Sequence, residues 1–184
     1  MASAFAHAVA AAAVGSGLGL STQQWRLLIL GMVWASIPDL DSIGFWWGIP
    51  YEHALGHRGL THSIPFAVVA SWGLVKLGWS GRSLMERRRL WLFFFLTMAS
   101  HGVLDALTDG GLGVAFFAPF DNERYFFPFR PLVVPPLEPN KFFSLRAIPI
   151  LMSEFLWVWI PSLAVILAAW WRRKARQVGR MPAR

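Results

Sequence analysis

The side chains of this sequence that could do chemistry are histidines and aspartates grouped in short motifs. The densest motif, residues 57–63, reads His-Arg-Gly-Leu-Thr-His-Ser and brings two imidazoles and a guanidinium close together. Seven residues are candidate metal ligands: His7, Asp39, Asp41, His57, His62, His101 and Asp105. Because the chain has no cysteine, imidazole nitrogens and carboxylate oxygens would have to hold any metal.

Two pairs in this set have an informative spacing. His101 and Asp105 are four residues apart, so on a helix both lie on one face and suit two ligands of one metal. A buried histidine–aspartate hydrogen bond explains this pair equally well. Asp39 and Asp41 follow Pro38 and could bind one ion, bridge two ions or cap a turn.

The two histidines of the dense motif have a different spacing. His57 and His62 are five residues apart, which does not fit one helical face. It predicts a loop that leads into a helix, with Thr61 or Ser63 as the N-cap. Either histidine alone could be a hydrogen-bonded residue at a membrane interface. His53 is a weaker ligand candidate, and His7 alone reads as a core histidine.

Histidine and aspartate ligands suit Zn²⁺, with Mn²⁺, Fe²⁺ and Mg²⁺ as alternatives. Because the candidates exceed the needs of one tetrahedral ion, we expect one to three ions, and two ions would lie about 3.5–4 Å apart. Asp39 or Asp41 could accept the proton of an activated water. Arg58 could neutralise a phosphoryl oxygen or contact a lipid headgroup. No His-Glu-x-x-His motif occurs, so phosphoester hydrolysis is favoured over peptide hydrolysis.

The composition indicates a membrane protein. Of the 184 residues, 55% are hydrophobic and only 15% are charged. There are 11 tryptophans against 2 tyrosines, and indole rings favour bilayer interfaces. No internal repeat or linker divides the chain, so residues 1–184 are predicted to form a single domain.

Five apolar runs predict an all-α polytopic membrane bundle of about five helices. The predicted helices cover residues 3–20, 24–37, 63–79, 88–108 and 147–172, with Pro149 in the first turn of the last helix and Pro161 kinking it. They are joined by a polar irregular segment 38–63, a basic loop 81–89 and a long connection 109–146 rich in proline and phenylalanine. We expect this connection to be an ordered flap on the membrane or over the site, with a short hairpin around 130–134. A signal peptide is the alternative for the first run, but that run lacks the basic stretch of such peptides.

The basic residues predict the topology. The net charge is +7, and its main clusters are Arg87–Arg89 and the tail 172–184. Both clusters adjoin apolar runs, which favours contacts with membrane lipids over nucleic-acid binding. If the tail is cytoplasmic, the basic loop is also cytoplasmic, as the positive-inside rule requires. All seven candidate ligands then lie near the outer face.

The motifs resemble the YdjM/DUF457 family of bacterial and archaeal inner-membrane proteins, which are described as membrane-bound metal-dependent hydrolases. The resemblance rests on the histidine in the first helix, Pro-Asp-Leu-Asp at 38–41, the dense motif, His-Gly-Val-Leu-Asp-Ala-Leu-Thr-Asp-Gly-Gly at 101–111, and Pro119-Phe120. It covers residues 1–125 and, by hydropathy, the last helix. It implies that the seven candidates are the metal ligands. It also implies a distant similarity to zinc-dependent phospholipase C and P1-type nucleases.

The sequence therefore predicts a multi-pass protein of the bacterial inner membrane that hydrolyses a phosphoester, in a lipid or lipid-like substrate, at the outer membrane interface. The alternative is a non-enzymatic membrane protein whose cluster binds a metal structurally or passes it onward. A transporter is less favoured because the ligands gather at one end of the bundle and not at the midplane. Glu154, Thr108 and Asp109 could support the ligands.

Overall fold

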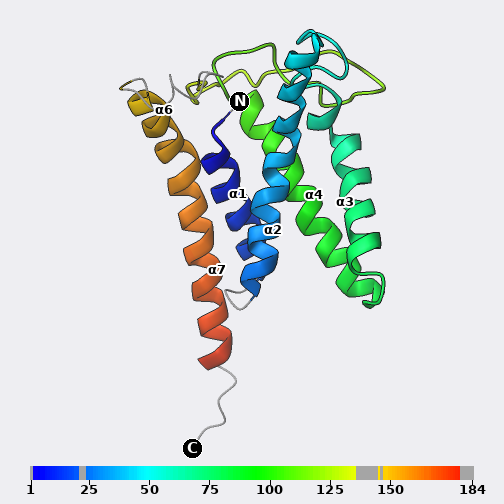
Figure 1. Ribbon diagram of the computed structural model, residues 1–184. Helices are drawn as coiled ribbons and strands as arrows, with labels where there is room; N and C mark the ends of the chain where they lie inside the picture. Colours follow the sequence, from blue (N-terminus) through cyan, green and yellow to red (C-terminus); the bar gives the residue numbers. More distant parts are fainter. Residues whose placement is uncertain (1, 21–23, 136–144, 146, 179–184) are drawn as a thin grey trace, which may run out of the picture.

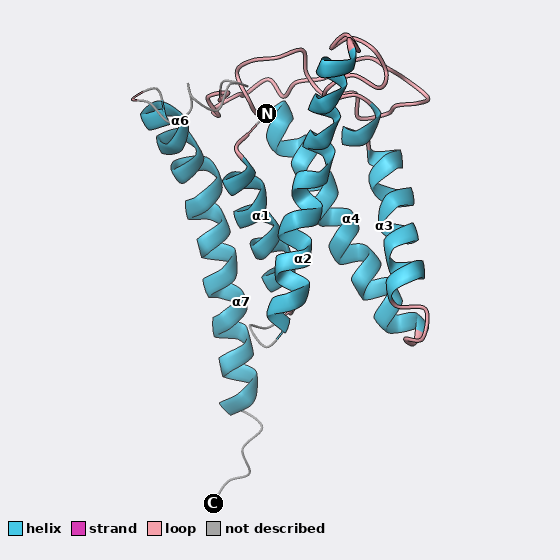
Figure 2. Cartoon of the chain, in the orientation of Figure 1, coloured by secondary structure: helices cyan, strands magenta, loops and turns pink. Residues whose placement is uncertain are grey.

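The protein is an all-α bundle in a computed structural model, which describes residues 2–20, 24–135, 145 and 147–178. Figure 2 shows helices and loops and no strand over these residues. The elements are α1 (Ala4–Gly17), α2 (Trp25–Ser36), η2 (Ile37–Trp47), η3 (Leu60–His62), α3 (Ile64–Gly78), α4 (Leu84–Ala106), α6 (Ala147–Glu154), η4 (Phe155–Trp159) and α7 (Ile160–Val178). The five predicted helices are confirmed, the last one being α6, η4 and α7 in succession.

The helices run side by side, and the bundle has two distinct ends (Figure 1). The end that we name the motif end holds the start of α1, η2, η3 and the last turn of α4. The opposite end, named the basic end, holds the turn between α3 and α4 and the end of α7. Within the bundle, α1 packs against α2, α4 and α7, and α3 packs against α4. The Ser3 hydroxyl caps α1 by accepting a hydrogen bond from the Ala6 amide.

The second helix does not stop at Pro38 as the sequence predicts. Its α-helical part ends at Ser36, and the chain continues as the 3₁₀ segment η2 to Trp47. A proline near the start of a helical segment lacks only an N–H that would be unpaired there, so Pro38 is tolerated in the first turn of η2. Asp39 and Asp41 therefore lie on a helical segment and not in an irregular loop.

The prediction that residues 81–89 form a basic loop is also wrong. α4 begins at Leu84, so Arg87–Arg89 belong to its first turns. The reason is a capping box, in which the Ser83 hydroxyl accepts from the Glu86 amide and the Glu86 carboxylate accepts from the Ser83 amide. This signal is present in the sequence.

The connection after α4 crosses the motif end, and its described part is held in place by backbone hydrogen bonds (Figure 1). The hairpin predicted around residues 130–134 is not formed. Leu132 instead makes an isolated parallel bridge to Thr108, and Val114 makes an isolated antiparallel bridge to Tyr125. Residues 136–144 and 146 of the predicted connection lie outside the described residues, as do residues 179–184 of the predicted tail.

The last helix contains a π-helical turn, η4, which ends at Trp159, two residues before Pro161. Pro161 has no N–H to donate to the preceding turn, and a wider turn is a common way for a helix to accommodate this. Pro149 lies in the first turn, as predicted.

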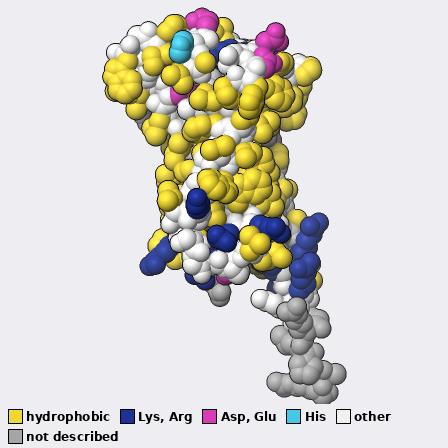
Figure 3. Space-filling model, turned by 90° about the vertical axis from the view of Figure 1, so that its right-hand side faces the viewer, with side chains coloured by type: hydrophobic (Ala, Val, Ile, Leu, Met, Phe, Trp, Pro, Cys, Tyr) yellow, Lys and Arg dark blue, Asp and Glu magenta, His cyan; other side chains and the backbone are white. Residues whose placement is uncertain are grey.

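The outer surface of the bundle is apolar. Figure 3 shows a broad band of hydrophobic side chains, with Lys and Arg side chains gathered beneath it at the basic end. Within the described ranges, two helical stretches are long and apolar enough to cross a membrane, Trp25–Trp47 and Ala147–Gln177. The 3₁₀ continuation of α2 gives the first stretch its length.

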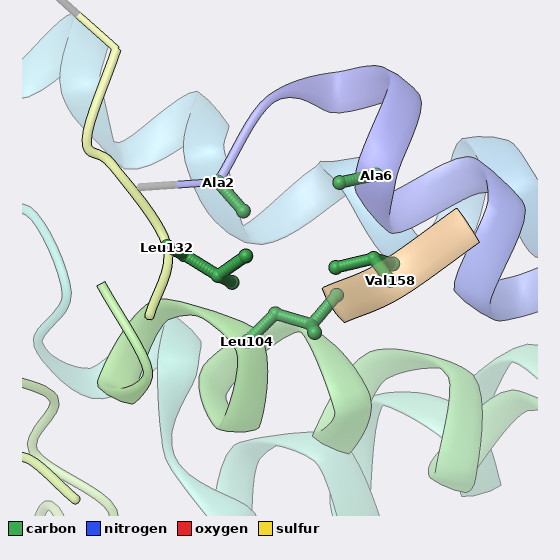
Figure 4. Packing of buried hydrophobic residues seen from close by; sticks show 5 residues of the cluster. All are labelled: Ala2, Ala6, Leu104, Leu132 and Val158. Carbon is green, nitrogen blue, oxygen red and sulfur yellow. The ribbon is translucent and has the colours of Figure 1, made fainter. Parts of the chain in front are cut away.

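A small buried cluster ties the elements of the motif end together. Ala2 and Ala6 at the start of α1 pack against Leu104 of α4, Leu132 of the connection and Val158 of η4 (Figure 4). This packing fixes α1 relative to α4, the two helices that carry His7 and His101.

Candidate metal centre

The structure brings all seven predicted ligands together at the motif end. Four of them offer one ligand atom each, and these atoms all lie within 4.8 Å of one another: Asp39, His62, His101 and Asp105. We name them the converging group. A second set, Asp41, His57 and His62, meets the same criterion and shares His62 with the first.

The distances within the converging group are those of a ligand set. His62 Nε2 lies 3.0 Å from His101 Nε2 and 3.7 Å from Asp39 Oδ1. His101 Nε2 lies 3.2 Å from Asp39 Oδ1, and Asp105 Oδ2 lies 3.6 Å from His62 Nε2 and 3.9 Å from His101 Nε2. A tetrahedral Zn²⁺ with ligands at roughly 2.0–2.1 Å would separate them by about 3.3 Å. The observed separations bracket that value.

Hydrogen bonds aim both imidazoles at this point. His101 Nδ1 lies 2.6 Å from the Ala35 carbonyl oxygen, which can only accept, so Nδ1 carries the proton and Nε2 has a free lone pair. His62 Nδ1 lies 3.1 Å from Asp41 Oδ2 and is fixed in the same way. Metal-binding histidines are usually oriented by such a partner on the other ring nitrogen.

Two buried carboxylate oxygens of the converging group have no hydrogen-bond partner within the part of the chain that the structure describes. They are Asp39 Oδ1 and Asp105 Oδ2. Buried polar atoms are nearly always paired. Asp105 Oδ2 has the Arg58 guanidinium 3.0 Å away, whereas Asp39 Oδ1 faces only imidazole nitrogens, so a cation at this point would compensate the charge that Arg58 leaves. The donor set therefore fits a divalent metal such as Zn²⁺.

Asp41 is placed differently, because donors surround its carboxylate. Oδ1 lies 2.7 Å from His57 Nδ1, and Oδ2 accepts from the Thr61 hydroxyl at 2.6 Å and from the Arg58 amide at 3.2 Å. With the His62 contact, both oxygens are occupied. This arrangement suits a carboxylate that orients His57 and His62.

The electrostatics of His62 follow from its two carboxylate neighbours. Burial disfavours the charged imidazole, but the neighbouring carboxylates of Asp39 and Asp41 outweigh it and raise the pKa of His62 to about 9. Without a metal, a protonated His62 directs an Nε2–H towards His101. A divalent ion bound there would have to displace this proton.

His7 lies beside the converging group. Its ring stacks on that of His101, with centroids 3.7 Å apart, and its Nε2 is 3.7 Å from Asp105 Oδ1. The ring is fully buried, and neither nitrogen has a hydrogen-bond partner. His7 therefore offers a further nitrogen to the centre, which agrees with its inclusion among the seven candidate ligands.

Arg58 is buried and bonded to protein groups. Its Nη1 donates to the Gly110 carbonyl at 2.9 Å, its Nη2 donates to the Thr108 hydroxyl at 3.0 Å, and its Nε lies 3.0 Å from Asp105 Oδ2. The Nε contact is an ion pair without hydrogen-bond alignment. These partners favour a role in holding Asp105 over the substrate contact predicted from the sequence.

The backbone around Arg58 depends on an unusual geometry. Arg58 has a φ of 62°, a left-handed conformation that surrounding contacts must hold for a non-glycine residue. Gly111, itself at a φ of 86°, lies under the guanidinium, and a Cβ there would come 2.8 Å from Arg58 Nη1. The guanidinium reaches Asp105 because this position is a glycine.

The other polar residues considered in the sequence lie outside the converging group. The exposed His53 ring accepts from the Leu55 amide and lies outside both ligand sets. Glu154 accepts two hydrogen bonds from Ser3, at 2.5 Å from the amide and 2.6 Å from the hydroxyl. It therefore anchors the residue that caps α1. Asp109 accepts from the Val134 amide and fastens the connection.

Several contacts of the centre have no sequence signal. The Ala35 carbonyl orients His101, and the Ala2 amide donates to Asp105 Oδ1 at 2.8 Å. Every residue carries such backbone groups, so only the fold selects them. Arg124, which donates to the His57 carbonyl at 2.9 Å and ties the connection to the dense motif, was also not identified.

The known proteins that this chain resembles are inner membrane proteins, in agreement with its apolar surface. The sequence model of the YdjM inner membrane protein family matches residues 1–176. The chain is 36% identical over 170 residues to the inner membrane protein YbcI of Escherichia coli K12, covering 91% of this chain and 96% of that protein. No solved structure matches.

Proposed function

This chain belongs to the YdjM family of inner membrane proteins, and from that premise we propose that it is a metal-dependent hydrolase of phosphoesters. The observation that carries the proposal is the converging group. Two imidazoles oriented by acceptors and two buried carboxylate oxygens that accept no hydrogen bond from the described residues are a ligand set that a divalent ion completes. Zn²⁺ suits this set best, with Mn²⁺, Fe²⁺ and Mg²⁺ as alternatives.

When bound, such an ion supplies Lewis-acid chemistry, since it polarises a phosphoryl oxygen and lowers the pKa of a water ligand. The protein residues hold and orient the ligands and accept protons. Asp39 is better placed than Asp41 to accept a proton, because donors contact both oxygens of Asp41 and because the Asp39 side chain is 12% exposed while that of Asp41 is 4% exposed. Arg58 keeps Asp105 charged and in position.

Asp39 also marks the access route to the centre. Its side chain is 12% exposed, while those of His62, His101 and Asp105 are fully buried. The same segment, η2, carries the exposed indoles of Trp46 and Trp47, and exposed indoles favour the membrane interface. We therefore propose a lipid or lipid-like phosphoester as the substrate. By the positive-inside rule, the basic end is cytoplasmic and the centre faces the periplasm.

The burial of the ligands favours a second candidate function. A centre in which His7, His101 and Asp105 have no exposed surface could hold an ion structurally or pass it onward without catalysis.

The test combines metal analysis with turnover on purified full-length protein loaded with Zn²⁺. Release of headgroup or phosphate from phosphatidylglycerol and phosphatidylethanolamine is measured for the wild type, Asp39→Asn and the control His53→Ala. We expect wild type and His53→Ala to hold metal and turn over, and Asp39→Asn to lose turnover. Protein that holds no metal would overturn both candidates. Metal without turnover on any phosphoester would favour the structural site.

A further inference from the structure

A pocket of about 340 Å³ lies between α3 and α4 at the basic end, far from the metal centre along α4. It is lined by three basic and four apolar side chains: Trp72, Val75, Lys76, Leu84, Arg87, Arg88 and Trp91. Lys and Arg side chains gather at this end of the molecule, directly beneath the hydrophobic band (Figure 3). The pocket therefore lies where an apolar surface meets a charged one.

The cations of this pocket lack anionic partners. Within the part of the chain that the structure describes, Arg87 and Arg88 make no side-chain hydrogen bond or ion pair, and Arg87 Nε is buried without a partner. Lys76 Nζ lies 4.7 Å from the centre of the Trp72 ring, which orients it but leaves its charge uncompensated. Among the described residues, no acidic side chain lines the pocket.

The nearest carboxylate in sequence is already engaged. Glu86 accepts from the amide and hydroxyl of Ser83 and pairs with Arg82 at 3.5 Å. Three cations meet here at the edge of an apolar bundle without an anionic partner among the described residues, and such a basic site between membrane helices favours an anionic headgroup.

The apolar wall of the pocket is suited to a hydrocarbon chain. Trp72 and Trp91 flank it, and the Trp91 indole is held by a hydrogen bond from Nε1 to the Val68 carbonyl at 3.3 Å. Val75 closes the floor as part of a buried cluster with Phe93 and Phe94. A ligand that fits must therefore carry a compact anion at one end and an apolar chain at the other.

Two other pockets at this end do not combine these features. One, of about 280 Å³ between α1 and α7, is also basic, but Arg173 there already donates to the Leu20 carbonyl at 2.8 Å. The other, of about 380 Å³, contains Glu86 beside Arg82 and Arg89, so its charges are mixed.

We propose that the pocket between α3 and α4 binds one anionic phospholipid. The phosphate accepts from Lys76, Arg87 and Arg88, and one acyl chain lies along Trp72 and Trp91. Basic pockets between membrane helices are suited to anionic headgroups. This site is independent of the metal centre and of the proposed hydrolysis.

The test is native mass spectrometry of the full-length protein in detergent, titrated with phosphatidylglycerol or with phosphatidylcholine as the uncharged counterpart. We expect one phosphatidylglycerol to bind in preference to phosphatidylcholine. Arg87→Gln/Arg88→Gln should weaken that binding by about 30-fold, because each basic side chain near an anionic headgroup contributes about fivefold. The matched control Arg172→Gln/Arg176→Gln removes the same charge from the other basic pocket and should retain the binding.

Equal loss in both double variants would overturn the proposal, since it would show diffuse attraction to a basic surface. So would equal binding of the two lipids, or complete displacement of phosphatidylglycerol by inorganic phosphate, which would show a site for the free anion. Circular dichroism checks that the variants fold. Arg87→Lys/Arg88→Lys should restore binding to within a few-fold and serves as the second variant if the glutamine variant unfolds.

Discussion

The two halves of the histidine–aspartate cluster differ in how their polar atoms are satisfied. Around Asp41, donors from His57, Arg58, Thr61 and His62 contact both carboxylate oxygens. In Asp39 and Asp105, one buried oxygen of each carboxylate faces two imidazole nitrogens and accepts no hydrogen bond from the described residues, although Arg58 forms an ion pair with Asp105. The same residue types occur in both halves, so composition does not explain the difference.

This difference assigns separate roles to the halves. A saturated carboxylate has little capacity left for a metal but can fix the rings that it contacts. Buried carboxylate oxygens that accept no hydrogen bond destabilise the folded protein unless a cation or a proton binds to them. We infer that the Asp41 half supports the Asp39 half, and His62, which belongs to both, joins them.

The largest expected effect comes from removing the buried cation that compensates Asp105. Arg58→Met should destabilise the protein by about 3–5 kcal/mol, because it leaves a buried carboxylate unpaired. Unfolding by SDS titration of metal-free protein in mild detergent measures this loss. The matched control is Arg130→Met, because the contact that Arg130 makes with the described residues is a cation–π contact with Phe126. Equal stability of the two variants would contradict a charged Asp105.

Removing a ligand should abolish tight metal binding with less effect on the fold. His101→Gln should lower Zn²⁺ affinity by more than about 100-fold, which exceeds the usual effect of residues that only orient ligands. Competition with a fluorescent chelator measures this affinity. His53→Gln, at an exposed histidine outside the cluster, is the control and should bind as wild type does. If His101→Gln leaves the Zn²⁺ affinity unchanged, the ion must bind elsewhere.

The supporting half should show an intermediate effect. Asp41→Asn keeps the size of the side chain but removes the charge that orients His57 and His62, so Zn²⁺ affinity should fall by about 10–100-fold. The same chelator competition applies. If Asp41→Asn loses as much Zn²⁺ affinity as His101→Gln, Asp41 is itself a ligand, and the two halves do not have separate roles.

The smallest expected effect is a dependence of the Zn²⁺ affinity on pH. The pKa of His62 is raised to about 9, so below this pH the imidazole holds a proton that the metal must displace. Zn²⁺ affinity should therefore fall by about tenfold for each unit as the pH drops from 9 to 7. Calorimetry in two buffers of different ionisation enthalpy should detect about one proton released per ion at pH 7. No release would contradict a protonated His62.

Much of this arrangement was predictable from the sequence, because apolar runs and cationic clusters determine where helices and their ends lie. The grouping of the ligand motifs at one end followed from alternating helix directions. The start of α4 could also have been predicted from Ser83 and Glu86, which form a capping box.

Other features depend on tertiary contacts that leave no local pattern. The role of Arg58 depends on Gly111, which is far along the chain and lies beneath the guanidinium. The orientation of His101 depends on the backbone of α2, since the Ala35 carbonyl accepts its Nδ1–H. Asp39 and Asp41 look equivalent in the sequence, and only the positions of the surrounding donors separate them.

The most direct test is X-ray absorption spectroscopy of Zn²⁺-loaded protein, which counts imidazole ligands from their multiple scattering. If the ion lies in the converging group, His101→Gln should remove one imidazole from the coordination shell and His57→Gln should remove none. Loss of an imidazole in His57→Gln with an unchanged shell in His101→Gln would place the ion in the Asp41 half and contradict this assignment.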